Sequence, residues 1–181
     1  MIEFTQEQLT LKAYELLKDK ARILDMGCGI GNFVGLNPEK IEGYDNNFEN
    51  VKHCKAKGYK VLRRDIRFLT LDEPKASFDG INCSHVLEHM VPEDAYKTIC
   101  CMDWLLKPDG LLVIQGPTIS DRFYDDFSHI KPYTPAALRH YFINKGGQRT
   151  YEDLRGTYVQ EELIWRKDHS GFLIAFRKHG T

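Results

Sequence analysis

The sequence predicts a single α/β domain with a mostly parallel β-sheet and helices on both faces. Short apolar runs bounded by Gly, Asp, Asn and Pro alternate with longer helical stretches, which is the pattern of parallel β-α-β units. The final segment breaks this alternation and is typical of an antiparallel hairpin. A chain of 181 residues, 42% of them hydrophobic, is long enough for one core and short for two, so we expect one domain over residues 1–181.

The apolar runs place the parallel strands, because each is short and is bounded by residues that favour turns. The expected strands are residues 21–25, 40–45, 59–65, 78–84 and 110–116.

Longer stretches with helical periodicity lie before and between these strands, and the helices are expected at residues 6–19, 47–57, 92–106 and 134–146. The third begins at Pro92, which suits a first helical turn, and Glu93 and Asp94 complement the positive end of its dipole. The sequence "KPDG" at 107–110 then ends it.

The hairpin is expected from two β-rich runs, 156–166 and 171–178, joined by "KDHSG". It adds antiparallel strands to one edge of the sheet, which makes seven strands in all. The least regular stretch is 116–133, "GPTISDRFYDDFSHIKPY", which is rich in aromatic and charged residues. Its length favours a loop that covers a substrate over a simple connector.

Composition restricts the partners and the compartment. The 25 basic and 26 acidic residues nearly cancel and are interspersed, which disfavours sequence-independent binding to nucleic acid or anionic lipid. The five cysteines form no C-x-x-C pair, as expected of reduced thiols. No leader pattern and no apolar run of roughly 20 residues is present. We expect a soluble, cytoplasmic protein that is a monomer or a homodimer.

A glycine-rich turn follows the first strand. "ILDMGCGIGNF" places Gly27, Gly29 and Gly31 where the backbone can turn tightly and approach a ligand that a Cβ would block. Asp45 ends the second strand, where a carboxylate can accept hydrogen bonds from both hydroxyls of a ribose, and Asp65 ends the third, where it can accept from an adenine amino group. We therefore expect one adenosine pocket at these strand ends.

Two cofactor classes, dinucleotides and adenosine compounds without phosphates, fit an adenosine pocket at this position, and the turn favours the one without phosphates. A dinucleotide fingerprint requires G-x-G-x-x-G and a helix N-terminus for the pyrophosphate. Here Asn32 stands where the last glycine is expected, and "VGLNPEK" interrupts the following helix with Asn37 and Pro38. An NAD-dependent oxidoreductase is accordingly the weaker alternative.

Five motifs in order resemble those of the class I S-adenosylmethionine-dependent methyltransferases: "ILDMGCGIGNF", "GYDNN", "RRDI", "FDGINCSHVLEHM" and "LKPDGLLVI". The resemblance covers residues 20–116 and implies a Rossmann-like methyltransferase sandwich with S-adenosylmethionine as cofactor. The short helix after the glycine-rich turn and the pattern "DDFSHIKPYTP" resemble those of a small, type 11-like subgroup of methyltransferases that is associated with glycan or cell-surface biosynthesis. By resemblance, Asp25, Gly27 and Gly29 face the methionine part of the cofactor, Asp45 holds the ribose, and Asp65 with Ile66 holds the adenine. The expected cofactor-binding set also includes Cys28, Asn46, Ser84 and His85.

The sequence "SHVLEHM" contains His85-x-x-Glu88-His89, which is also the spacing of an inverted zinc-protease signature. A zinc hydrolase needs both histidines on one helix face and a third ligand. "VLEHMVP" makes barely two turns before Pro92, so we expect no metal and regard the zinc hydrolase as a minor alternative. His89 is interpreted as structural, and Glu88 as a residue that orients a neighbour.

Methyl transfer from a sulfonium requires alignment, a dry pocket and a base for an acceptor that carries a proton. His129, beside Asp125 and Asp126, is the first candidate for that base, with His85 as the second. A structural role for His129, in a turn capped by Asp126 and Ser128, remains an alternative. Cys83 has no obvious base partner for nucleophilic catalysis.

The expected acceptor is an oxygen or nitrogen of a small molecule, with a sugar or glycan precursor as one possibility. The segment after the fourth strand contains no "DPPY" or "NPPY", which disfavours DNA as an acceptor. A non-catalytic domain that binds S-adenosylmethionine is the main alternative from another functional class.

Overall fold

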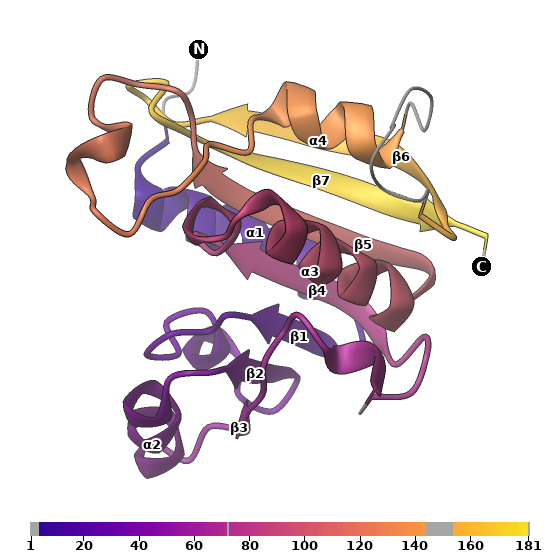
Figure 1. Cartoon of the computed structure of the whole chain (residues 1–181). Coiled ribbons are helices and arrows are strands. Elements are labelled where there is room, and N and C mark those ends of the chain that lie inside the picture. Colours follow the sequence, from indigo (N-terminus) through magenta and orange to yellow (C-terminus); the bar gives the residue numbers. More distant parts are fainter. Residues whose placement is uncertain (1–3, 72, 144–153, 181) are drawn as a thin grey trace.

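The computed structural model describes residues 4–71, 73–143 and 154–180, and its centre is a seven-stranded sheet of order β3-β2-β1-β4-β5-β7-β6 (Figure 1). β1 to β5 pair in parallel, and β7 runs antiparallel to both β5 and β6. The predicted parallel sheet with a terminal hairpin is therefore confirmed. The strands are β1 (Ile23–Met26), β2 (Ile41–Asp45), β3 (Val61–Arg63), β4 (Phe78–Ser84), β5 (Leu106–Pro117), β6 (Thr157–Trp165) and β7 (Gly171–His179).

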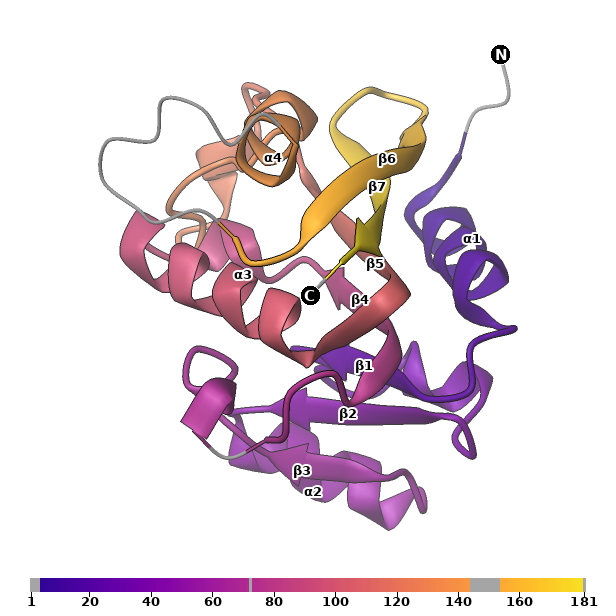
Figure 2. The ribbon, with the colours of Figure 1, turned by 90° about the vertical axis from the view of Figure 1, so that its right-hand side faces the viewer.

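Four α-helices in the described residues cover the two faces of the sheet (Figure 2). They are α1 (Gln6–Leu17), α2 (Phe48–Ala56), α3 (Pro92–Leu105) and α4 (Pro135–Phe142). Buried side chains of α1 and α2 form one core with one face of the sheet, and those of α3 and α4 form a second core on the other face. Local signals fix the helix starts, since Thr5 makes a capping box and the side chains of Asn47 and Thr134 accept backbone N–H groups of their helices.

Element boundaries differ modestly from those predicted. β3 is shorter than the predicted 59–65, and α4 ends at Phe142, while residues 144–146 of the predicted helix lie outside the described residues. None of the helices within the described ranges is long and apolar enough to cross a membrane.

The turn after β1 leads into a single 3₁₀ turn, η1 (Val34–Leu36), in place of a long helix. The side chain of Tyr59 packs against this turn. A Cβ on Gly31 would lie 3.0 Å from the Tyr59 ring, and a Cβ on Gly35 would lie 2.7 Å from its hydroxyl oxygen. The predicted interruption of the helix after the glycine-rich turn is therefore present, and it leaves little helix to hold a diphosphate.

A buried ion pair joins α3 to the terminal hairpin. Lys178 Nζ lies 3.3 Å from Asp103 Oδ1, and both side chains are almost fully buried. Tyr158 donates its hydroxyl to Asp103 at 2.7 Å, and the backbone N–H of Gly156 also donates to this carboxylate. Burial lowers the pKa of Lys178. These contacts hold β6 and β7 against the helix layer.

Candidate functional site

Two adjoining cavities lie at the carboxyl edge of the sheet, where β1, β2 and β4 end. Their volumes are about 770 Å³ and about 370 Å³, and both are lined by Gly27, Gly29 and His85. Open α/β sheets bind ligands at this edge. Of the remaining residues predicted to bind a cofactor, the larger cavity is lined by Asp45, Asn46, Asp65 and Ile66, and the smaller by Asp25, Cys28 and Ser84.

The glycine turn has a backbone that residues with a side chain rarely adopt. Gly27, Gly29 and Gly31 all have positive φ, at 75°, 53° and 82°. The N–H groups of Gly27 and Cys28 both donate to the carbonyl of Tyr44, which ties the turn to the neighbouring strand. A Cβ on Gly27 would overlap Val86 Cγ2, whereas one on Gly29 would have no atom within 4 Å. The turn is therefore packed on one side and open on the other.

Asp45 is held in place by the backbone around it. Its Oδ2 accepts the N–H of Gly29 at 2.8 Å, and its Oδ1 accepts the N–H of Asn47 at 2.8 Å and Nδ2 of Asn50 at 3.3 Å. Each carboxylate oxygen has two lone pairs, so Asp45 keeps acceptor capacity on Oδ2 for a ligand in the larger cavity. Asn46, the next residue, lines the same cavity.

Asp65 lines the larger cavity but already has a strong partner within the chain. Arg67 donates to both of its oxygens, at 2.9 Å from Nε to Oδ1 and at 2.6 Å from Nη2 to Oδ2, and these hydrogen bonds lower the pKa of Asp65. Arg67 also reaches Asp94 of α3 at 2.8 Å. Sequence reasoning missed Arg67, although a basic residue two positions after a strand-end carboxylate was a signal for such a pair.

Asp25 is buried beside the smaller cavity. It is 3% exposed, accepts Nδ2 of Asn82 at 2.7 Å, and burial raises its pKa to about 7. Asn82 is fully buried in β4, and its Oδ1 has no hydrogen-bond partner within the described part of the chain. Sequence reasoning missed Asn82, although a polar residue inside the apolar run "FDGINCS" was a usable signal.

Cys28 in the glycine turn and Cys83 near the end of β4 are poor nucleophiles. The sulfur of Cys28 packs over β2, where a Cβ on Gly43 would lie 2.7 Å from it, and burial raises the pKa of this thiol. Burial also raises the pKa of Cys83 well above its ordinary value. Neither thiol is therefore suited to nucleophilic catalysis.

His85 lies where the two cavities meet and is oriented by a buried carboxylate. Its backbone φ is 55°, and its N–H donates to the carbonyl of Gln115 at the end of β5. Nδ1 of His85 lies 2.9 Å from Oε1 of Glu88, which is 2% exposed. This contact leaves Nε2 of His85 as the ring nitrogen for a ligand.

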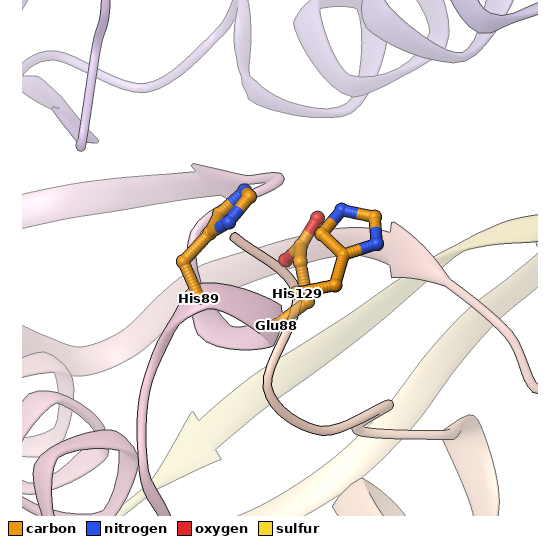
Figure 3. Close-up of side chains that lie close together, drawn as sticks. All are labelled: Glu88, His89 and His129. Atoms are coloured by element: carbon orange, nitrogen blue, oxygen red, sulfur yellow. The ribbon is translucent and has the colours of Figure 1, made fainter. Parts of the chain in front are cut away.

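His129 lines neither cavity, but its ring centroid lies 5.0 Å from that of His89, which lines the larger one. Its Nδ1 is 2.6 Å from the carbonyl oxygen of Phe123, and its Nε2 is 3.8 Å from Oδ2 of Asp126. Figure 3 shows His129 next to Glu88 and His89, and ligand atoms of these three side chains lie within 4.8 Å of one another. The structure thus brings His129 to the segment that carries His85, because Glu88 contacts His85 and also belongs to the cluster with His129.

The H-x-x-E-H segment does not have the geometry of a zinc-protease helix. It forms only one 3₁₀ turn, η3 (Leu87–His89), and His85 lies before that turn with a left-handed backbone. Two histidines four residues apart face one side only when they share an α-helix. The inverted zinc-protease arrangement is therefore absent.

Comparisons with known proteins agree with this arrangement. A family model described as a methyltransferase domain matches residues 2–175. The mitochondrial ubiquinone biosynthesis O-methyltransferase of Homo sapiens is 31% identical over 51% of this chain and 28% of its own length. The tRNA (carboxymethyluridine(34)-5-O)-methyltransferase of Arabidopsis thaliana is 31% identical over 70% of this chain and 30% of its own length. The chain thus spans less than a third of these two relatives.

Among solved structures, a SAM-dependent methyltransferase from Archaeoglobus fulgidus superposes with a TM-score of 0.73 at 21% identity, covering 96% of this chain and 95% of that chain. At this level of identity the likeness shows a shared fold.

Proposed function

The chain belongs to the methyltransferase domain family, and from this premise we propose that it transfers the methyl group of S-adenosylmethionine to an oxygen or nitrogen of a small molecule. The observation that carries the proposal is that Asp25, Asp45 and the glycine turn lie around two adjoining cavities that share Gly27, Gly29 and His85. A ligand with a nucleoside at one end and an amino acid at the other matches a pair of cavities that meet at Gly27 and Gly29.

In this proposal the larger cavity holds the adenosine and the smaller holds the methionine part. Asp45, fixed by the N–H of Gly29, accepts one ribose hydroxyl on Oδ2, with Asn46 beside it. The adenine lies beside Ile66, and Arg67 fixes the orientation of Asp65 at the rim. The ammonium group of the methionine part faces Asp25, while Cys28 contributes its backbone and Ser84 lines the wall.

When bound, S-adenosylmethionine supplies a methyl group that is already activated by a sulfonium. The chain then has to align the acceptor, exclude water and take up the acceptor's proton. We assign that proton to Nε2 of His85, because Glu88 fixes the ring through Nδ1 and His85 lies at the junction of the cavities. The bound cofactor would supply the methyl group to the acceptor oxygen or nitrogen and would leave as S-adenosylhomocysteine, while His85 holds the proton that the acceptor loses. His129 becomes the weaker candidate, because it lines neither cavity.

A small molecule with a hydroxyl or amino group, such as a sugar or glycan precursor, is the acceptor class that we propose. Balanced charge over the whole chain supports a small acceptor, since binding to an extended phosphate backbone requires a basic surface. The matched tRNA methyltransferase makes a structured RNA the first acceptor to test against this choice.

The test is a search for co-purified S-adenosylmethionine or S-adenosylhomocysteine, followed by a screen of acceptors for release of S-adenosylhomocysteine. Nucleotide sugars, simple phenols, amines and total tRNA form the panel. We expect turnover with a small molecule, and we expect His85→Ala to abolish it while His53→Ala, on the exposed side of α2, retains it. Cofactor binding without turnover on any acceptor would favour the non-catalytic binding domain instead.

A further inference from the structure

We propose that Glu88, His89 and His129 bind a divalent transition-metal ion beside the methyl-transfer cavity, and that this ion holds the acceptor through a hydroxyl oxygen. The inference departs from the sequence-based expectation of no metal. The metal site is inferred from the geometry of these three residues alone, while the role of the ion in catalysis rests on the proposed function.

The three side chains converge from two segments far apart in the sequence. Glu88 and His89 come from η3, and His129 comes from the loop after β5 (Figure 3). Backbone hydrogen bonds clamp the segments together, because the N–H of Ile130 donates to the carbonyl of Glu88 at 2.7 Å. One ligand atom from each residue lies within 4.8 Å of the others. Bonds of about 2.1 Å to one ion place neighbouring ligand atoms roughly 3.0–3.5 Å apart, so the three side chains have to move slightly closer together to share one ion.

Both histidines are already oriented as metal ligands usually are. Nδ1 of His129 lies 2.6 Å from the carbonyl oxygen of Phe123. Nδ1 of His89 lies 2.9 Å from Oγ and 3.1 Å from the carbonyl oxygen of Ser128. The Ser128 hydroxyl donates to Asp126 at 2.6 Å, so it accepts from His89. Each ring therefore carries its proton on Nδ1 and keeps the lone pair of Nε2 for an ion, which is the common outer-shell arrangement of ligating histidines.

Glu88 gives the site its charge. It is 2% exposed, and within the described part of the chain the ion-pair partner of its carboxylate is His85, which is charged only when protonated. A buried carboxylate without a permanent counter-charge is costly, and a divalent cation removes that cost. Asp126, with Oδ2 at 3.8 Å from Nε2 of His129, adds a second negative charge next to the site.

Two imidazoles and one carboxylate favour a transition metal over Mg²⁺ or Ca²⁺, which prefer oxygen ligands alone. Three protein ligands leave coordination positions open, as in catalytic rather than structural sites.

His89 and Ile130 line the larger cavity, so the site borders the space next to His85. An ion there lowers the pKa of a coordinated hydroxyl. The hydroxyl proton leaves to His85 or solvent, and the oxygen then takes the methyl group as the carbon–sulfur bond breaks.

The experiment is a titration of the chelator-treated full chain with Mn²⁺, in which free Mn²⁺ is measured by its electron paramagnetic resonance signal. Binding of Zn²⁺ and Mg²⁺ is measured by calorimetry. We expect one Mn²⁺ per chain, and tighter binding of Mn²⁺ and Zn²⁺ than of Mg²⁺. His89→Gln and His129→Ala should each weaken Mn²⁺ binding by at least about 100-fold. His140→Ala, an exposed histidine of α4, is the matched control and should leave it unchanged. Absence of stoichiometric binding, or equal binding by all these variants, would overturn the site.

S-adenosylmethionine binding is measured by calorimetry on the same samples, which separates this inference from the proposed function. Cofactor binding without Mn²⁺ binding rejects the metal site alone, and Mn²⁺ binding without cofactor binding rejects the methyltransferase. With an acceptor in hand, chelation should abolish turnover and Mn²⁺ should restore it. Full turnover after chelation would overturn the role assigned to the ion.

Discussion

At the scale of single residues, Asp25 is the carboxyl group of the proposed cofactor site whose pKa burial raises. Burial raises its pKa to about 7, so the free protein holds this group protonated below that pH. An ammonium group beside it favours the carboxylate, and binding of S-adenosylmethionine then releases a proton at low pH. Affinity should therefore rise with pH through about 7, by roughly tenfold between pH 6 and pH 8.

The control is Asp25→Asn, which keeps an acceptor for Asn82 and cannot titrate. Titration of groups on S-adenosylmethionine changes its dissociation constant equally for the wild-type protein and for Asp25→Asn. The ratio of these two dissociation constants therefore reports only the protonation of Asp25. Calorimetry at three pH values measures this ratio. A ratio that is constant with pH would contradict the placement of the ammonium group.

Asp45 is the second residue that the proposal requires. Asp45→Asn replaces one oxygen of a carboxylate that accepts the N–H groups of Gly29 and Asn47, and removes the charge that binds a ribose hydroxyl. Hydrogen bonds to charged groups contribute about 1.5–3 kcal/mol, so S-adenosylmethionine affinity should fall by about 10- to 100-fold. Asp19→Asn, in an exposed position after α1, should leave the affinity unchanged. Equal affinities for the two variants would exclude Asp45 from the ribose contact.

At the scale of elements, the glycine turn contributes both to stability and to cofactor binding, and substitutions at Gly27 and Gly29 should affect these two properties differently. Alanine at position 27 or 29 must adopt positive φ, which costs about 1 kcal/mol in either case. Gly27→Ala also overlaps Val86, so its free energy of unfolding should fall by roughly 1–3 kcal/mol more than that of Gly29→Ala. Gly29→Ala projects its methyl group into open space beside both cavities and should mainly lower cofactor affinity. Denaturant unfolding and calorimetry on both variants measure the difference.

Elements were largely predictable from the sequence, because apolar period and turn residues are local signals. The strands after residues 20, 40 and 77 and the helix from Pro92 lie where these signals place them. The short β3 and the early end of α4 depend on neighbours that a local pattern does not contain.

The candidate site was predictable only in part, for the same reason. The strand ends placed Asp25, Asp45 and Asp65 together, because carboxyl ends of parallel strands share one edge. The pairing of Arg67 with Asp94, and that of His129 with η3, joins residues that are 27 and about 40 positions apart. Such contacts are set by packing, and no sequence periodicity reports them.

At the scale of the whole molecule, the buried pair of Asp103 and Lys178 connects the helix layer to the last strand. Lys178→Met removes the cation and leaves Asp103 buried with neutral donors, so the free energy of unfolding should fall by about 3–5 kcal/mol. Lys18→Met breaks the exposed ion pair with Glu15 and should change the free energy of unfolding by less than about 1 kcal/mol. Denaturant unfolding compares the two, and equal effects would show that the buried pair has no special role in the fold.

The proposed chemistry requires one nucleoside ligand that occupies both adjoining cavities at the carboxyl edge of the sheet. Calorimetry of the purified chain with S-adenosylmethionine, S-adenosylhomocysteine and NAD tests this most directly. We predict binding of the first two at one site per chain and no binding of NAD. Absence of heat with both S-adenosyl compounds, or binding of NAD in their place, would contradict the central claim.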